Sequence, residues 1–181
     1  VLLHHVRSLY PDVPAVFSDT GLEFPEIRQF VKSTENVTCL RPAMTFRQVI
    51  EKHGYPVIGK EQSEWVQRMR SGGERVLRAK YYGIMPDGRT TRFKLSEQWR
   101  YLLDAPFRIG AGCCNEMKKK PLKKYAKETG RVPFIGTMAA ESKLRTQLWI
   151  KNGCNAFQAK RRISTPLSFW TEADIWAYIR R

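Results

Sequence analysis

Two adjacent cysteines, Cys113 and Cys114, stand shortly before five lysines that share the seven positions 118–124. Free cysteines are commonly buried, so simple packing in the core is one interpretation of the pair. A second interpretation is redox chemistry, because Lys118 and Lys119 would lower the pKa of a nearby thiol and favour its thiolate. A third is iron–sulfur ligation, which takes thiolates from separated segments of the chain.

Cys154, in the segment NGCNAF, supplies a third thiolate under the iron–sulfur interpretation. Three thiolates leave such a cluster one ligand short. A zinc ion would accept histidine as a fourth ligand, but the histidines of the chain are distant in sequence from these cysteines: His4, His5 and His53. More cations follow Cys154: Lys160, Arg161 and Arg162. Basic runs are usually solvated surface, although their position beside thiols also suits a bound anion.

The segment SDTGLEFPE, residues 18–26, follows an apolar run of strand length and precedes a helix that Pro25 opens. In open parallel sheets, ligands bind at this carboxyl edge. Gly21 lets the backbone approach a ligand closely, while Asp19 and Thr20 offer polar groups that can read a ribose or a base. The alternative is an ordinary turn with an acidic helix start, and this segment alone favours neither.

The segment GTMAAESKLR, residues 136–145, repeats the arrangement of strand end, glycine and helix start. Gly136 ends the predicted strand, and Lys143 and Arg145 lie on the helical turn that follows. Amides at a helix start, together with basic side chains, form a site for an anion. The alternative is a solvated first turn in which Arg145 forms a surface ion pair. Two such loops on one sheet edge favour anion binding.

The elements that must position these residues alternate between strand and helix, which predicts an α/β fold with parallel βαβ units. We expect three strands, at residues 13–19, 36–41 and 132–138. We expect helices over residues 1–10 and from Pro25, Thr45, Pro121, Ala140 and Thr171 onward. Two of these starts carry the spacing of a capping box, Thr45 with Gln48 and Thr171 with Asp174.

Residues 55–95 lack this alternation and combine short helical patches, the turn signal MPDGRT and many arginines. We expect an irregular, basic insertion here, inside a single domain that covers residues 1–181. The chain opens at Val1 within an apolar stretch that reads as a helix, and it stops after about two turns of another helix. We therefore expect this domain to be truncated at both ends.

The chain is strongly basic, with 32 Lys and Arg against 17 Asp and Glu, a net charge of +15 and a pI of about 10.0. This excess favours polyanionic partners such as nucleic acid. No apolar run approaches the roughly 18 residues that span a bilayer, and the N-terminal residues lack the pattern of a signal peptide. With four cysteines and no sign of secretion, we expect a cytoplasmic protein with reduced thiols.

Four segments in order resemble the phosphoadenosine phosphosulfate (PAPS) reductase family of adenine nucleotide alpha-hydrolase-like (PP-loop) proteins. VFSDTGLEFPE is similar to the loop after that family's second strand, and CCNEMKKKPL to the cysteine-pair segment of its iron–sulfur members. GTMAAESKLR resembles the family's loop of Gly, Glu or Gln, Ser and Arg, and ISTPLSFWTEADIWAYI resembles its PL..W...D.W.YI segment. One such match is weak, whereas four in order are specific.

The resemblance implies a Rossmann-like, mostly parallel sheet with helices on both faces, which binds an adenine nucleotide at its carboxyl edge. It implies sulfur chemistry, namely reduction of adenosine phosphosulfate or PAPS to sulfite in sulfate assimilation, with a thiol electron donor such as thioredoxin. In sister groups the chemistry is ATP-dependent thiolation, and the acceptor would be DNA or tRNA. The basic excess suits this alternative, because a small nucleotide does not need +15 spread along a chain.

The resemblance also assigns roles to residues. It assigns nucleotide binding to the two strand-end loops, through Asp19, Thr20, Gly21, Gly136, Lys143 and Arg145. It assigns ligation of a four-iron four-sulfur cluster to Cys113, Cys114 and Cys154. Lys118 would lie between the cluster and the nucleotide, and Lys118 and Arg145 would be catalytic because they offset charge on the sulfonyl oxygens.

The chain departs from the family pattern in four respects. The pyrophosphate-binding SGGKDS loop is absent, and residues 1–10 look like the helix that follows it. The C-terminal redox cysteine is absent as well. Cys154 stands alone where the adenylylsulfate reductases have a Cys-x-x-Cys pair, so a fourth cluster ligand would be Cys39 or lie beyond Arg181. Met117 occupies the position of the family's arginine before the lysine.

Overall fold

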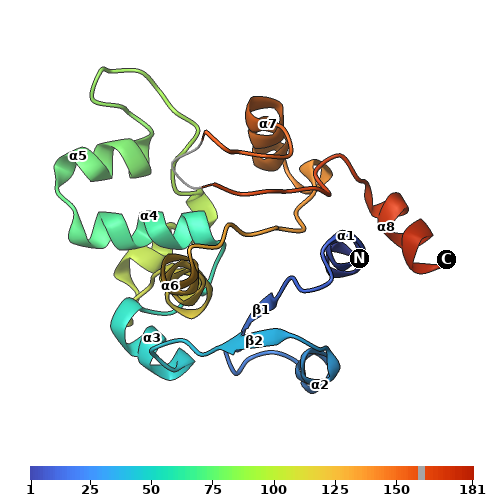
Figure 1. Ribbon diagram of the computed structural model, residues 1–181. Helices are drawn as coiled ribbons and strands as arrows, with labels where there is room; N and C mark the ends of the chain where they lie inside the picture. The colour runs from blue at the N-terminus through green and yellow to red at the C-terminus, as the bar shows by residue number, and fades with distance from the viewer. Residues whose placement is uncertain (159–161) are drawn as a thin grey trace. The chain divides into compact units, whose positions relative to one another are not determined.

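Two short strands, β1 (Ala15–Ser18) and β2 (Val37–Leu40), form a sheet, and α2 (Pro25–Ser33) connects them. The backbone amide of Ala15 donates to the carbonyl of Asn36, and the amide of Asp19 donates to the carbonyl of Leu40. Because both partners advance along the chain together, the strands are parallel. The computed structural model, which describes residues 1–158 and 162–181, thus has the α/β character that the sequence predicts (Figure 1).

Helices make up most of the remaining regular structure in these residues. The α-helices are α1 (Leu2–Leu9), α3 (Phe46–His53), α4 (Lys60–Ser71), α5 (Glu74–Leu77), α6 (Lys120–Thr129), α7 (Lys143–Asn152) and α8 (Glu172–Ile179). Two π-helical turns, η1 (Arg78–Tyr82) and η3 (Asn115–Lys119), and two 3-10 helices, η2 (Glu97–Asp104) and η4 (Ala139–Glu141), complete the set. None of the helices in the described ranges combines the length and the apolar character that a bilayer crossing requires.

Two of the expected helix starts, at Thr45 and Thr171, are confirmed by their capping geometry. At α3, the Thr45 hydroxyl accepts from the amide of Gln48, whose side chain accepts from the amide of Thr45. Thr171 and Asp174 form the same reciprocal pair at α8. These bonds satisfy amides that the first turn of a helix leaves without partners, which is why the Thr-x-x-Gln and Thr-x-x-Asp patterns locate both starts.

The chain divides into two compact units. The first unit comprises Val1–Phe17, Gln29–Thr38 and Lys123–Arg181, and the second comprises Ser18–Arg28 and Cys39–Leu122. The core of the second unit is apolar and comes from α4, η2 and the loops around them: Trp65, Val66, Met69, Leu95, Leu102 and Ile109. Several of these residues fall within residues 55–95, so the stretch that was expected to be irregular supplies much of this core. The single domain over residues 1–181 stays a prediction.

The first unit buries Val6, Ala139, Ala156 and Leu167. The strand expected at residues 132–138 is reduced to one isolated parallel bridge, between Phe134 and Ser164. The helix expected after it is present as α7. A strand forms only where a neighbouring segment pairs with it along several residues. In the described part of this unit, the segment of Ser164 pairs with residues 132–138 through a single bridge.

Candidate functional site

The loop that follows β1 is held by hydrogen bonds among its own polar groups. The Thr20 hydroxyl donates to Oε1 of Glu23 over 2.6 Å, and the Thr20 amide donates to Oε2 over 3.0 Å. Partial burial raises the pKa of Glu23, but these hydrogen bonds outweigh it and hold that pKa below its ordinary value. The loop therefore keeps a charged carboxylate that is directed at its own backbone and not at a ligand.

Asp19 and Gly21 form the tip of the same loop. One carboxylate oxygen of Asp19 accepts from the Gly21 amide over 3.1 Å, and the other pairs with the Arg28 guanidinium at 3.1 Å. Gly21 has a φ of 78°, which favours glycine, and a Cβ at this position would meet only open space. The backbone at Gly21 is thus exposed, as the predicted nucleotide-binding role requires.

A hydrogen bond joins this loop to the segment that carries the cysteine pair. The Ser18 hydroxyl donates to the carbonyl of Met117 over 2.8 Å, although the two residues are 99 positions apart in sequence. Met117 is 3% exposed, whereas the next residue, Lys118, is exposed. The second unit therefore brings together two predicted features, the Asp19–Gly21 tip and the Cys113–Lys118 segment.

The cysteine pair lies at the start of η3, on a loop that packs tightly against the end of α3. A Cβ at Gly110 would lie 1.9 Å from the carbonyl oxygen of His53, and one at Gly112 would lie 2.7 Å from Cγ of the His53 ring. Only glycine fits such distances. Cys113 and Cys114 are both half-buried and free of disulfides.

Glu116 anchors the same segment through the contacts of its side chain. Its side chain is 9% exposed, and its Oε1 lies 2.7 Å from Nζ of Lys120 and 3.4 Å from Nε2 of His53. The hydrogen bond from Lys120 holds the pKa of Glu116 below its ordinary value, against the effect of burial. Nε2 of His53 is buried and meets no partner with hydrogen-bond geometry among the described residues. The Glu116 carboxylate is therefore the negative group that faces both the Lys120 ammonium and the His53 ring.

In the first unit, the loop before α7 closes on itself through Glu141. One carboxylate oxygen accepts from the amide of Met138 over 2.8 Å, and the other forms an ion pair with Arg145. Ser142 caps α7 by accepting from the amide of Arg145. Arg145 thus forms the surface ion pair of the alternative interpretation, whereas Lys143 is exposed and has no ion-pair partner in the described part of the chain.

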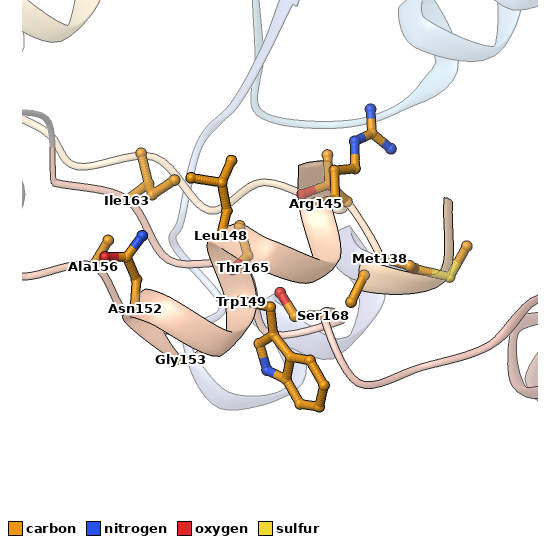
Figure 2. Close-up of a pocket in the computed structure, with 12 residues that line it drawn as sticks. Met138, Arg145, Leu148, Trp149, Asn152, Gly153, Ala156, Ile163, Thr165 and Ser168 are labelled. Carbon is orange, nitrogen blue, oxygen red and sulfur yellow. The ribbon is translucent and has the colours of Figure 1, made fainter. Parts of the chain in front are cut away.

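A hollow of about 90 Å³ adjoins this loop, and α7 forms one of its walls (Figure 2). Arg145, Leu148 and Trp149 of α7 line it, and Thr165 and Ser168 line it from the segment before α8. Figure 2 shows the side chains of Arg145 and Trp149 leaving the helix in different directions. The hollow combines three hydroxyls, from Thr137, Thr165 and Ser168, with the indole of Trp149 and with Arg145, whose charge Glu141 offsets.

Cys154 follows Gly153, which lines the same hollow. The carbonyl of Cys154 accepts from the amide of Thr165 over 2.7 Å and from the hydroxyl of Thr165 over 3.2 Å. The thiol of Cys154 is half-buried and free. Of the basic residues predicted to follow it, Lys160 and Arg161 lie outside the described residues.

The cysteines divide between the two units, with Cys113 and Cys114 in the second and Cys154 in the first. Within residues 1–158 and 162–181, no group of three or more His, Cys, Asp or Glu side chains is placed to hold a metal ion. The donor chemistry of Cys113 and Cys114, two neighbouring free thiols beside an exposed lysine, fits the cysteine-pair half of an iron–sulfur site. The complete set of three cysteines stays a prediction from sequence.

The sequence gives no role to Ser18 or Glu116, and it places His53 far from the cysteines along the chain. A signal for His53 was present, because Gly110 and Gly112 indicate a close approach of another segment, but the sequence does not say which segment. No sequence pattern gives Ser18 a role, since a hydrogen bond to a carbonyl 99 positions away leaves no local pattern.

One comparison with known proteins identifies a family. The family model described as "Phosphoadenosine phosphosulfate reductase domain" matches residues 77–181, which is more than half of the chain. Among curated proteins, no sequence matches the chain. The matched residues include the cysteine pair, Lys118, the loop before α7 and Cys154, and they associate the chain with adenine-nucleotide-related sulfur metabolism.

Proposed function

Because the chain belongs to the phosphoadenosine phosphosulfate reductase domain family, we propose that it is an oxidoreductase that reduces a sulfonucleotide, adenosine phosphosulfate or PAPS, to sulfite. The nucleotide would bind at the carboxyl edge of a Rossmann-like sheet, to which β1 and β2 would contribute two strands. The observation that carries the proposal is the hydrogen bond from Ser18 to Met117, which joins the exposed loop at that edge to the segment of Lys118.

The proposed binding residues follow from their positions in the loops. The backbone at Gly21 is open to a nucleoside, and Asp19 and Thr20 define the shape of that loop through their hydrogen bonds. Gly136, Lys143 and Arg145 would bind the phosphates or the sulfate. Arg145 is paired with Glu141, so the exposed ammonium group of Lys143 is the more available cation of the two.

The proposed reaction consumes one dithiol. A thiolate of the donor, a protein such as thioredoxin, attacks the sulfate sulfur, forming an S–S bond while the bond from sulfur to the phosphate oxygen breaks. The adenosine phosphate leaves with that electron pair. The second thiol of the donor, after loss of its proton, attacks the first sulfur, so the donor is oxidised to a disulfide and sulfite departs. Lys118 and Arg145 would stabilise the charge on the sulfonyl oxygens.

A four-iron four-sulfur cluster is part of the proposal. Cys113 and Cys114 would hold it, and Cys154 would add a third thiolate on the evidence of the sequence. When bound, the cluster would supply a fixed charge near the cysteine pair. Anaerobically purified protein should then be brown and contain iron and labile sulfide, and Cys113→Ser should lose iron. Colourless, folded, iron-free protein would exclude the cluster.

The test of the reaction is sulfite release from adenosine phosphosulfate and from PAPS with a dithiol donor. Lys118→Gln should lower kcat about 100-fold, the size of effect seen when one group that stabilises developing charge is removed. Lys119→Gln is the matched control, because it removes the same charge from the next position and should leave kcat within a factor of two or three. Equal losses in both variants, or no binding of either sulfonucleotide, would overturn the proposal.

The charge of +15 favours a second candidate, ATP-dependent thiolation of DNA or tRNA within the same superfamily. This enzyme would hydrolyse ATP in the presence of nucleic acid and release no sulfite. Assays of ATP hydrolysis and sulfite release on one preparation therefore separate the two candidates.

A further inference from the structure

Residues 74–95, which we name the basic hairpin, project from the core of the second unit next to α4 (Figure 1). They comprise α5, η1 and a turn whose two arms are hydrogen bonded. The amide of Met85 donates to the carbonyl of Arg89, and the amide of Leu95 donates to the carbonyl of Lys80. Leu95 is fully buried in the core, so the hairpin has a fixed base.

The basic hairpin carries more positive charge than its own acids neutralise. The basic hairpin contains two carboxylates, Glu74 and Asp87, against six cations: Arg75, Arg78, Lys80, Arg89, Arg92 and Lys94. Arg89 pairs with Asp87 at 2.6 Å. Lys80 lies over the ring of Trp65 and donates to the carbonyl of Phe93. In the described part of the chain, the other four cations have no ion-pair partner.

Two aromatic side chains stand among these cations and are largely exposed to solvent. Phe93 is 66% exposed and directly follows Arg92, and Tyr82 is 58% exposed on the same helical turn as Arg78. The ring of Tyr82 lies edge-on to that of Tyr81, with 4.9 Å between the centroids. Aromatic rings in such positions can stack on unpaired nucleobases, and neighbouring cations can bind the phosphates between those bases.

A hollow of about 290 Å³ lies at the side of the basic hairpin. Arg75 and Arg78, one helical turn apart, line it together with Glu74 and the turn residues Ile84, Met85, Pro86 and Gly88. Two guanidinium groups on one wall can grip a phosphate through paired hydrogen bonds. The single carboxylate on the wall reduces the positive charge but does not cancel it.

We propose that the basic hairpin binds single-stranded nucleic acid, with Arg75 and Arg78 on the phosphates and Tyr82 and Phe93 stacked on bases. Charge complementarity selects a polyanion, and the exposed rings select unpaired bases over a duplex. The strand-end loop and the cysteine segment are not part of this surface. The proposal therefore stands whichever reaction the protein catalyses.

The test is fluorescence anisotropy with a labelled single-stranded oligonucleotide, with the same sequence as a duplex for comparison, between about 50 and 200 mM salt. The unmodified protein should bind the single strand more tightly. Phe93→Ala and Tyr82→Ala should each weaken this binding about 5- to 100-fold, because each removes one stacking platform. Phe93→Trp should retain it.

The double variant Arg75→Gln/Arg78→Gln should reduce the slope of log K against log salt by about 1.4, at about 0.7 for each phosphate contact to a single strand. Arg47→Gln/Lys52→Gln on α3 removes the same charge elsewhere in this unit and is the matched control. All four hairpin side chains are exposed, and circular dichroism would verify that every variant is folded.

Three outcomes would overturn the proposal. Equal losses in the hairpin and control variants would mean that net charge alone drives binding. Equal affinity for duplex, unchanged by Phe93→Ala, would exclude stacking. Binding to anionic lipid vesicles without binding to the oligonucleotide would assign the surface to a membrane. Because sulfonucleotide binding uses other residues, the hairpin variants should retain it, so either proposal can fail alone.

Discussion

Glu116 is a nearly buried carboxylate near Lys120 and His53, and it lies two positions after Cys114. Lys120 donates a short hydrogen bond to it, and His53 lies within ion-pair distance. A buried charge is tolerated only when partners compensate it. Removing the Glu116 carboxylate or the group that pairs with it should therefore lower the free energy of unfolding. The residue therefore stabilises the position of the cysteine segment, whatever the thiols bind.

Glu116→Ala should lower the free energy of unfolding by about 1.5 to 3 kcal/mol, because it removes the charge-assisted hydrogen bond from Lys120. Glu128→Ala is the control, since Glu128 pairs with Lys124 at 3.9 Å on the surface and its loss should cost under about 1 kcal/mol. Urea unfolding of both variants measures the difference. Similar small losses in both would show that Glu116 does not anchor the segment.

Glu23 provides a pH-dependent contribution to stability. Its pKa is lowered in the folded chain from an ordinary value of 4.5, so its contribution is complete above that pH and is lost as the pH falls through the lowered pKa. In Thr20→Val the hydroxyl donor is gone, and the pKa of Glu23 should rise. NMR titration of the Glu23 carboxyl in the unmodified protein and in Thr20→Val checks this. An unchanged pKa would mean that the Thr20 hydroxyl does not stabilise the carboxylate.

At the scale of elements, local patterns predicted helix starts well and strand pairing poorly. Thr45 and Thr171 reveal their helices because a capping box is complete within four residues. Residues 132–138 have the composition of a buried strand but form only the Phe134 bridge, because pairing depends on residues far along the chain. The core residues around Trp65 were missed for a local reason, since charged residues such as Arg68 and Arg70 obscure the apolar face of α4.

The contact between α3 and the loop before the cysteine pair depends on glycine at position 110. Gly110→Ala should destabilise the protein by more than about 2 kcal/mol, since its Cβ would overlap the His53 carbonyl and force the backbones apart. Gly59→Ala is a fair comparison, because its Cβ would meet open space. Thermal unfolding of both variants tests the contact, and a Gly110→Ala protein as stable as Gly59→Ala would refute it.

For the whole molecule, the dominant property is a charge of +15 on 181 residues. The sequence alone predicted a preference for polyanions from this charge, and the family match covers three of the four short segments that carry the resemblance. The sequence did not predict which cations would lack partners. Arg145 is paired with Glu141 and Arg89 with Asp87, whereas Arg75 and Arg78 line a hollow, and only the folded chain distinguishes these cases.

Self-repulsion at this charge should destabilise the folded protein at low ionic strength. The melting temperature should therefore rise between about 0.05 and 0.5 M sodium chloride, where the screening length shortens from above 10 Å to about 4 Å. Chloride is preferable to sulfate, which strengthens apolar burial by a separate effect. A melting temperature that falls over this range would show that favourable ion pairs outweigh the repulsion.

The hydrogen bond from Ser18 to Met117 also has a consequence for the order of folding. It closes a loop of 99 residues, and the buried residues of the second unit's core, from Trp65 to Ile109, all lie inside that loop. Closing so long a loop costs entropy that the core must first offset. The strand-end loop and the cysteine pair should therefore meet late, after the intervening helices have packed. A chain halted before that stage would contain the strand-end loop and the cysteine pair but would not hold them next to each other.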